Sequence, residues 1–303
     1  MGRIQLEEVG LREGLQSNPE ILTMEQKVNL IDMVMESGIE RIQLGSFVNE
    51  KRVPQMAGVE ELFQRYADKD GVLFSGLVLN RKGLERAVEC GVKLLNISIS
   101  ASDTHNRENT GKGIAEALPG ITDMIKEAVS AGIRVRAGIQ AAFGCYYEGR
   151  VDEERVYTLT EKYLEAGADE IGLSDTAGFA RPAQVERICR RVSAMSGDRP
   201  LGLHMHDTFG MAMANVLAGI EGGAVIFDSS VAGMGGCPFM KGAPGNQATE
   251  DMVYMLQSMG ELKSVSLGAI VKAAELAKGI YGREFNSRIS VHYPLIEKLN
   301  LTD

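Results

Sequence analysis

The stretch EAGADEIGL, residues 165–173, joins the end of a helix to a glycine and then to a strand, and this junction recurs along the chain. A helix that ends at a glycine and leads straight into an apolar strand is part of a βα repeat. Five copies of one junction therefore imply a single repeated unit. The other four are ESGIERIQL (36–44), ECGVKLLNI (89–97), SAGIRVRAG (130–138) and EGGAVIFDS (221–229).

Short β-branched runs alternate eight times with segments of helical period, which predicts an α/β fold with a parallel sheet. Eight βα units favour a closed (β/α)8 TIM barrel. An open dinucleotide-binding sheet should carry G-x-G-x-x-G after its first strand, and residues 9–14 lack it. The predicted strands are Arg3–Val9, Glu40–Leu44, Val72–Val78, Lys93–Ser98, Arg134–Gln140, Glu170–Leu173, Leu201–His204 and Val225–Ser229.

Two further patterns concern the helices. Thr23 to Gln26 has the form of a capping box before KVNLIDMVMESG, which predicts that a helix begins there. After a last barrel helix near 247–259, the segment LGAIVKAAELAKG (267–279) predicts one more helix. We therefore expect a catalytic barrel over residues 1–262 and a C-terminal helical extension over residues 263–303 that packs on the barrel or at a subunit contact.

Bulk composition narrows the function classes. The chain of 303 residues has a net charge of −9 and no basic run, which argues against nucleic acid as a partner. No signal peptide and no apolar run of about 18 residues is present, so we expect no membrane association. Four scattered cysteines without a C-x-x-C pair indicate a reducing compartment, and we expect a cytoplasmic protein.

The segment LHMHDT (203–208) places His204 and His206 two residues apart where the seventh strand meets its loop. Side chains at this spacing leave a strand on the same face, and catalytic groups of such barrels lie at these strand ends. Glu13 after the first strand and Asn246 after the eighth are oxygen donors that closure of the barrel would bring alongside. Two imidazoles, a carboxylate and an amide oxygen with open positions favour Mg²⁺ or Mn²⁺.

Arginine and cysteine residues extend this predicted site. Arg12 precedes Glu13 and offers a permanent cation to an oxyanion. The glycine-rich segment 229–246 carries Cys237, whose thiol is mostly protonated at neutral pH and so suits a proton donor. Asp175 ends the sixth strand and is either a catalytic carboxylate or a helix cap.

The polar stretch SASDTHNRENTG after the fourth strand holds His105 and Arg107. These two residues could contact substrate, could act as a second acid or base, or could belong to an ordinary polar loop.

Together these groups favour aldol or Claisen cleavage. A divalent cation lowers the pKa of a substrate hydroxyl, a base removes the proton, and a carbon–carbon bond breaks to leave an enolate. Arg12 would stabilise the enolate oxygen, and Cys237 would protonate its carbon.

Five motifs resemble those of the 3-hydroxy-3-methylglutaryl-CoA (HMG-CoA) lyase family, among the metal-dependent barrel lyases related to isopropylmalate and homocitrate synthases. The resemblance runs from about residue 4 to 256 and implies cleavage of the thioester to acetyl-CoA and acetoacetate, a step of leucine degradation. It implies metal ligands Glu13, His204, His206 and Asn246, catalytic roles for Arg12, Asp175, His204 and Cys237, and substrate contacts at Gln16, Gln43, Ser46 and His105. The motifs are GLREGLQ (10–16), SFVNEKRVPQM (46–56), GLSDTAG (172–178), GLHMHDTFGMAMANVLAGIEGG (202–223) and SSVAGMGGCPFMKGAPGNQATEDMVYML (229–256).

The chain departs from the family pattern at two positions. The lyases usually have Asp where Glu13 stands, and they carry Glu where this chain has Gln43. A neutral amide neither accepts a proton nor balances the charge of Arg12, so we expect a changed rate, a changed substrate or both. An acyl-CoA partner and a homodimer or higher homo-oligomer are expected.

Three alternatives therefore stay open at this point. The first is a lyase for a 3-hydroxyacyl-CoA with a different C3 substituent. The second is a synthase that condenses acetyl-CoA with a 2-oxo acid, and the third is a non-catalytic barrel that binds acyl-CoA.

Overall fold

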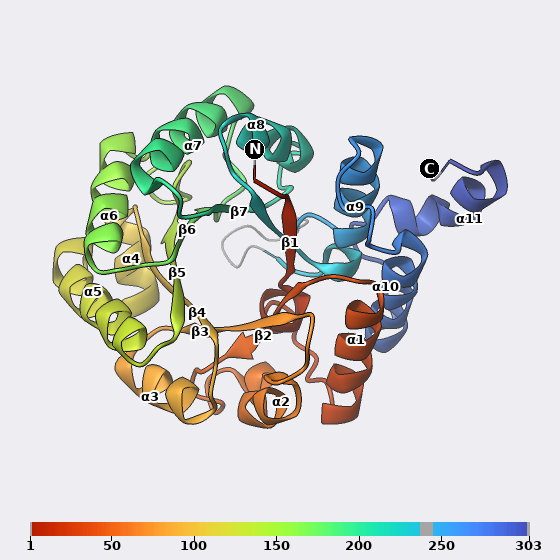
Figure 1. Cartoon of the computed structure of the whole chain (residues 1–303), viewed down its shortest axis with the longest axis horizontal. Coiled ribbons are helices and arrows are strands. Elements are labelled where there is room, and N and C mark those ends of the chain that lie inside the picture. The colour runs from red at the N-terminus through yellow and green to blue at the C-terminus, as the bar shows by residue number, and fades with distance from the viewer. Residues whose placement is uncertain (1, 237–244, 302–303) are drawn as a thin grey trace.

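Eight parallel strands close into a barrel in chain order, which confirms the predicted (β/α)8 fold (Figure 1). The structure is a computed structural model and describes residues 2–236 and 245–301. β1 pairs with β8 as well as with β2, so the sheet has no free edge. The strands are β1 (Gln5–Glu8), β2 (Arg41–Ser46), β3 (Leu73–Val78), β4 (Leu94–Ser100), β5 (Arg134–Gln140), β6 (Glu170–Asp175), β7 (Leu201–Met205) and β8 (Ile226–Ser229).

Helices surround the barrel, and the predicted helix signals are found where the sequence places them. The Thr23 hydroxyl accepts a hydrogen bond from the amide of Gln26, whose side chain accepts one from the amide of Thr23, completing the capping box. The glycines of the five repeated junctions all have φ between 68° and 94°, where only glycine avoids a steric penalty. The helices are α1 (Met24–Glu36), α2 (Val59–Tyr66), α3 (Arg81–Glu89), α4 (Asp103–Thr110), α5 (Ile114–Ser130), α6 (Glu153–Glu165), α7 (Pro182–Ser196), α8 (Ala212–Glu221), α9 (Thr249–Ser258), α10 (Leu267–Tyr281) and α11 (Ile289–Leu299), with short turns η1 (Gly10–Gly14), η2 (Pro54–Met56) and η3 (Val231–Gly233).

The C-terminal helices gather on one side of the barrel, with α11 outermost (Figure 1). α10 packs against α1 and η3, and α11 packs against α9 and α10. Whether residue 262 marks a domain boundary stays a prediction. Among residues 2–236 and 245–301, none of the helices combines the length and hydrophobicity that a bilayer crossing requires.

Ion pairs, rather than branched apolar side chains alone, cross the barrel interior. Arg41 pairs with Glu7 at 3.0 Å and with Glu170 at 2.7 Å. Arg136 pairs with Glu7 at 3.2 Å and with Asp228 at 2.6 Å. All five side chains are at most 10% exposed, so these charges interact in a medium that screens them weakly. The interior is therefore a connected charge network.

Two glycines make room for this network. A Cβ added at Gly202 would lie 2.6 Å from the Cζ atom of Arg136, and one at Gly172 would lie 3.0 Å from its Nε atom. Any larger residue on these neighbouring strands would push Arg136 away from its partners.

We therefore expect Gly202→Ala to lower the free energy of unfolding by about 1–3 kcal/mol through overpacking. Gly279→Ala is a matched control, because Gly279 lies inside α10 and nothing lies within 4 Å of an added Cβ. Since alanine is the better helix former, the control should gain about 0.5–1 kcal/mol. Urea unfolding measures both variants, and equal effects of the two substitutions would contradict the expectation.

Candidate metal centre and active site

The segment GLREG, residues 10–14, forms one π-helical turn directly after β1. Such turns often occur at functional sites. A Cβ at Gly10 would lie 2.5 Å from the carboxylate of Glu8, and one at Gly14 would lie 2.9 Å from Met234. The two glycines thus let the turn pack tightly, and Arg12 and Glu13 between them are only partly exposed.

Glu13, His204 and His206 converge although 191 residues separate the first two. The Oε1 atom of Glu13 lies 3.2 Å from Nε2 of His204 and 3.0 Å from Nε2 of His206. The two imidazole Nε2 atoms are 3.1 Å apart. Three potential ligand atoms therefore face one point at the carboxyl end of β7, where the sequence predicted a metal site.

Asn246 is positioned as the predicted fourth donor. Its backbone forms a β-bridge with His206, and its side-chain amide donates to the carbonyl of Met234 at 3.0 Å. The Oδ1 atom is buried and has no hydrogen-bond partner among the described residues. A buried amide oxygen is costly unless something binds it, so this atom fits a role as a metal ligand.

Electrostatics within the cluster favour a cation. Burial alone would raise the pKa of Glu13, but the charges of His204 and Arg12 outweigh it and hold this pKa well below its usual value. Burial would lower the pKa of His204, but Glu13 and Asp228 raise it to about 9. The carboxylate of Glu13 thus stays ionised. The negative charge that favours a proton on His204 also favours a divalent cation bound by the lone pairs of Glu13 and the histidines.

Arg12 lies beside Glu13 and Gln43. Its guanidinium pairs with Glu13 at 2.7 Å, and its Nε donates to the side-chain oxygen of Gln43 in a short hydrogen bond. Gln43 is 3% exposed, and the pairing of β2 with β3 shifts between Gln43 and Gly45, an irregularity that can re-aim a side chain. Gln43 therefore orients Arg12 while leaving Glu13 as its ionic partner.

The structure gives Asp175 a clear local role. Its carboxylate accepts hydrogen bonds from the loop amides of Phe179 at 2.8 Å and Ala180 at 3.1 Å. The N-cap of the following helix α7 is Arg181, so the alternative prediction that Asp175 caps a helix is wrong. Burial raises its pKa to about 6, against the smaller opposing effects of these amides and of the two histidines. Its catalytic role stays a prediction beside this structural one.

The remaining predicted residues have other neighbours or lie elsewhere. The Ser46 hydroxyl donates to the carbonyl of Leu77 at 3.3 Å, and Gln16 is exposed just after the Arg12 turn. His105 is buried in α4 beside Asn109, while Arg107 pairs with Asp103 at 2.7 Å on the surface. Cys237 lies outside the described residues, so its role stays a prediction.

Sequence reasoning missed Asp228 and Arg136. Asp228 lies 3.2 Å from Nδ1 of His204, and Arg136 pairs with Asp228. A signal was present, because RVRAG and IFDS place charged residues inside predicted strands, but the sequence did not show that Arg136 and Asp228 face one another.

Two buried carboxylates hold the segment that carries Asn246. Glu8 accepts hydrogen bonds from the amides of Gly10 and Val231 and from the Thr249 hydroxyl, and so ties the end of β1 to η3 and α9. Glu250 accepts one from the amide of Ala232 at 3.1 Å, and its second oxygen is buried without a partner among the described residues.

Glu250 should make stability depend on pH. Burial raises its pKa from 4.5 to about 7, so between these values the folded protein binds more protons than the unfolded chain. Its contribution is fully present below pH 4.5 and is lost as the pH rises to 7, by about 3 kcal/mol.

Glu250→Gln should therefore gain up to about that amount over wild type between pH 4.5 and 8. Urea unfolding across this range measures the difference, with Glu36→Gln on the exposed end of α1 as the control. A constant difference between Glu250→Gln and wild type would contradict the expectation.

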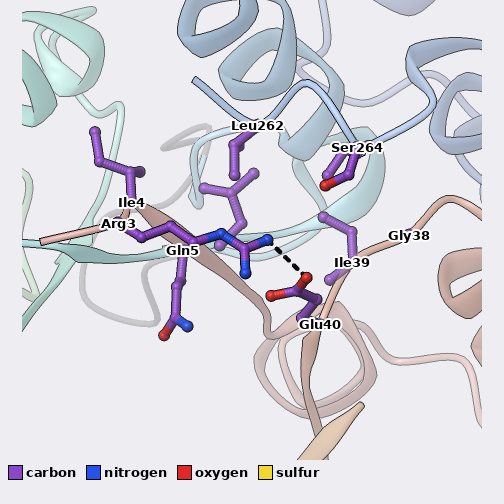
Figure 2. A pocket seen from close by; sticks show the side chains of 10 residues that line it. Arg3, Ile4, Gln5, Gly38, Ile39, Glu40, Leu262 and Ser264 are labelled. Carbon is purple, nitrogen blue, oxygen red and sulfur yellow. Dashed lines mark hydrogen bonds and ion pairs between the residues drawn. The ribbon is translucent and has the colours of Figure 1, made fainter. Parts of the chain in front are cut away.

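The opposite end of the barrel has a small pocket between the start of β1 and the segment before β2 (Figure 2). The Arg3–Glu40 ion pair, 2.7 Å long, lies across it. Its volume is about 10 Å³, which holds no more than about one water molecule. It is therefore too small to be a substrate site.

Comparison with known proteins agrees with this geometry. A family model described as HMGL-like matches residues 3–277. The chain belongs to the HMGL-like family. This chain is 37% identical to hydroxymethylglutaryl-CoA lyase YngG of Bacillus subtilis, over 94% of this chain and 96% of the relative. A Pseudomonas aeruginosa relative named 3-hydroxy-3-isohexenylglutaryl-CoA/hydroxymethylglutaryl-CoA lyase is 36% identical over 94% and 95% of the two chains.

Solved structures give the same assignment to this HMGL-like protein. The crystal structure of the Bacillus subtilis HMG-CoA lyase matches with a TM-score of 0.92 at 36% identity, over 96% of this chain and 98% of that one. An Acinetobacter baumannii HMG-CoA lyase in complex with coenzyme A and 3-methylmalate matches with a TM-score of 0.89 at 35% identity, over 95% and 94%. These matches confirm the predicted family and favour neither the synthase nor the non-catalytic alternative.

Proposed function

We propose that this protein cleaves HMG-CoA to acetyl-CoA and acetoacetate with a divalent cation, Mg²⁺ or Mn²⁺. The C3 hydroxyl gives its proton to a basic group of the site, the bond between C2 and C3 breaks, and C3 becomes the ketone of acetoacetate. The electron pair of that bond stays on C2 as the enolate of acetyl-CoA, which takes up one proton. The convergence of Glu13, His204 and His206 at the carboxyl end of the barrel carries this proposal.

Four residues would hold the cation: Glu13, His204, His206 and Asn246. When bound, it supplies Lewis acidity that lowers the pKa of the substrate hydroxyl. Arg12, held by Gln43, would stabilise the enolate oxygen through its guanidinium. Cys237 would donate the proton to C2, and Asp175, whose pKa burial raises to about 6, would share in proton movement.

One assay tests the reaction directly. The purified protein with Mg²⁺ or Mn²⁺ should release equal amounts of acetyl-CoA and acetoacetate from HMG-CoA. Chelation should abolish this release, and added cation should restore it. Release that continues after complete chelation would contradict metal dependence, and binding of the thioester without cleavage would favour the non-catalytic alternative.

Gln43 bears on rate and substrate range. With a carboxylate at this position, Arg12 would gain a second anionic partner. Its ion pair with Glu13 would then hold less of the negative charge of Glu13 away from the cation. We therefore expect Gln43→Glu to raise kcat/KM for HMG-CoA, by about 3–10-fold if the anionic acceptor strengthens the existing hydrogen bond from Arg12 by about 1 kcal/mol.

The same variant should be compared on thioesters with longer C3 substituents, because one relative is named for an isohexenyl substrate. Gln55→Glu, on a half-buried glutamine whose amide donates to the carbonyl of Asn18, controls for an added charge and a lost amide donor at another glutamine. If wild type prefers a longer substituent by tenfold or more, HMG-CoA is not the main substrate.

Assembly and compartment complete the proposal. The three described cysteines are free, which suits a reducing compartment such as the cytoplasm. Val291, Leu295 and Leu299 are each more than half exposed and repeat every four residues on α11, which supports contact with another subunit. A homodimer or higher homo-oligomer remains our expectation, and light scattering measures it.

A further inference from the structure

His204 is contacted at both of its ring nitrogens. Nε2 faces Glu13 and His206 at the candidate metal centre, while Nδ1 lies 3.2 Å from the Oδ2 atom of Asp228. His204 and Asp228 are paired positions of β7 and β8 in the barrel register. Backbone pairing therefore fixes the carboxylate behind the imidazole.

Arg136 determines how Asp228 can be used. Its NH1 group donates to Oδ1 of Asp228 at 2.6 Å and to Glu7 at 3.2 Å. A guanidinium has donors only, so it always claims an acceptor oxygen and keeps Asp228 ionised. The remaining oxygen of Asp228 can only accept a hydrogen bond, and Nδ1 of His204 is the group facing it.

The glycines at positions 172 and 202 make this arrangement possible. Arg136 crosses the barrel above both, where a larger residue would meet its side chain. The Arg136 side chain is 4% exposed, so it could replace its contact with Asp228 by water only if it moved out of the barrel interior. Strand register and the two glycines without side chains therefore fix the Arg136–Asp228 pair in place.

We propose that Arg136 and Asp228 are positioning residues that hold His204 with its proton on Nδ1 and its Nε2 lone pair directed at the cation. The inference rests on the metal-dependent function proposed above. A ligating histidine usually donates its other ring N–H to a partner of this kind, and loss of the partner typically costs 10–100-fold in metal affinity.

Asp228→Asn gives a specific expectation. Arg136 requires an oxygen, so the new amide would turn its oxygen to Arg136 and its NH₂ group to His204. An NH₂ group facing Nδ1 favours the tautomer protonated at Nε2, which cannot bind the cation through Nε2. Removing one carboxylate charge without changing the shape of the side chain should thus weaken the cation site.

Mn²⁺ binding, followed by electron paramagnetic resonance without substrate, tests this. Asp228→Asn should raise the Kd at least tenfold, while the melting temperature of the metal-free variant shows that it folds. Glu170→Gln is the matched control, because it also removes a buried partner of an interior arginine but has no described contact with His204. Its Kd should stay within about twofold of wild type. An unchanged Kd for Asp228→Asn, or equal weakening in both variants, would overturn the proposal.

A second measurement does not depend on the variant folding. In the NMR spectrum of wild type labelled with ¹⁵N-histidine and loaded with Mg²⁺, the four histidines should give separate signals. The signal that disappears in His204→Ala is that of His204. His204 should carry its proton on Nδ1, and a bare Nδ1 would overturn the proposal. If wild type binds cation with this tautomer but cleaves no thioester, the proposed function fails while the positioning role stands.

Discussion

His204→Ala is expected to lower kcat/KM for HMG-CoA by about 10³-fold or more. The substitution removes one ligand of the proposed cation and leaves Asp228 without its imidazole partner. Because a Lewis-acidic metal contributes several kcal/mol of transition-state stabilisation, losing about 4 kcal/mol corresponds to about 10³ in rate. Release of acetyl-CoA at saturating Mg²⁺ measures the effect.

His292→Ala is the matched control, since His292 is exposed on α11 and far along the chain from the cluster. It should retain wild-type activity. A less than tenfold loss in His204→Ala at saturating cation would show that the convergence of Glu13, His204 and His206 is not the metal centre. Mn²⁺ titration of the same variant separates lost metal binding from lost chemistry.

Cys237→Ala is expected to lower kcat by about 10²–10⁴-fold, the range in which a positioned acid or base contributes. Alanine cannot donate the proton that C2 of the enolate requires, and water would have to replace the thiol. The expected loss is in kcat, because the thiol would act after the substrate binds. Steady-state kinetics over HMG-CoA concentration, with Mn²⁺ affinity measured in parallel, distinguish the two parameters.

Cys90→Ala controls for removal of a thiol, because Cys90 ends α3, half-buried on the outer layer. It should leave kcat unchanged. If Cys237→Ala retains more than a third of wild-type kcat, another group protonates the carbon, and Asp175 with its raised pKa becomes the first residue to test. Loss of Mn²⁺ affinity in Cys237→Ala would instead indicate a structural role for residues 229–246.

The repeated junction and the paired histidines show how far sequence patterns extend. Glycines at helix ends predicted where strands begin, because the turn after each helix needs a residue with φ near 80° and glycine adopts this φ without steric cost. The spacing of His204 and His206 predicted a shared face because side chains alternate along a strand. Predicted strand ends differ from the observed ones by up to two residues, since pairing with neighbours decides where a strand stops.

Gln43 illustrates an intermediate case. The resemblance predicts that an amide stands where the lyases carry a carboxylate, but the sequence cannot show which neighbour the amide contacts. The structure places its oxygen on Nε of Arg12, so Gln43 orients the arginine without neutralising it. The chemical consequence follows from the residue type, and the contact follows from the irregular pairing of β2 with β3.

By itself, the sequence determined the closed barrel and its family and predicted a set of metal-binding side chains, because periodicity, glycine geometry and donor chemistry are local properties. Only the tertiary structure decided that Asp228 backs His204 and that Arg136 spans the barrel over Gly172 and Gly202. These contacts join strands far apart in the chain, and they arise because closure and register set which inward-facing charges meet. The interior ion-pair network, invisible in any one strand, is the result.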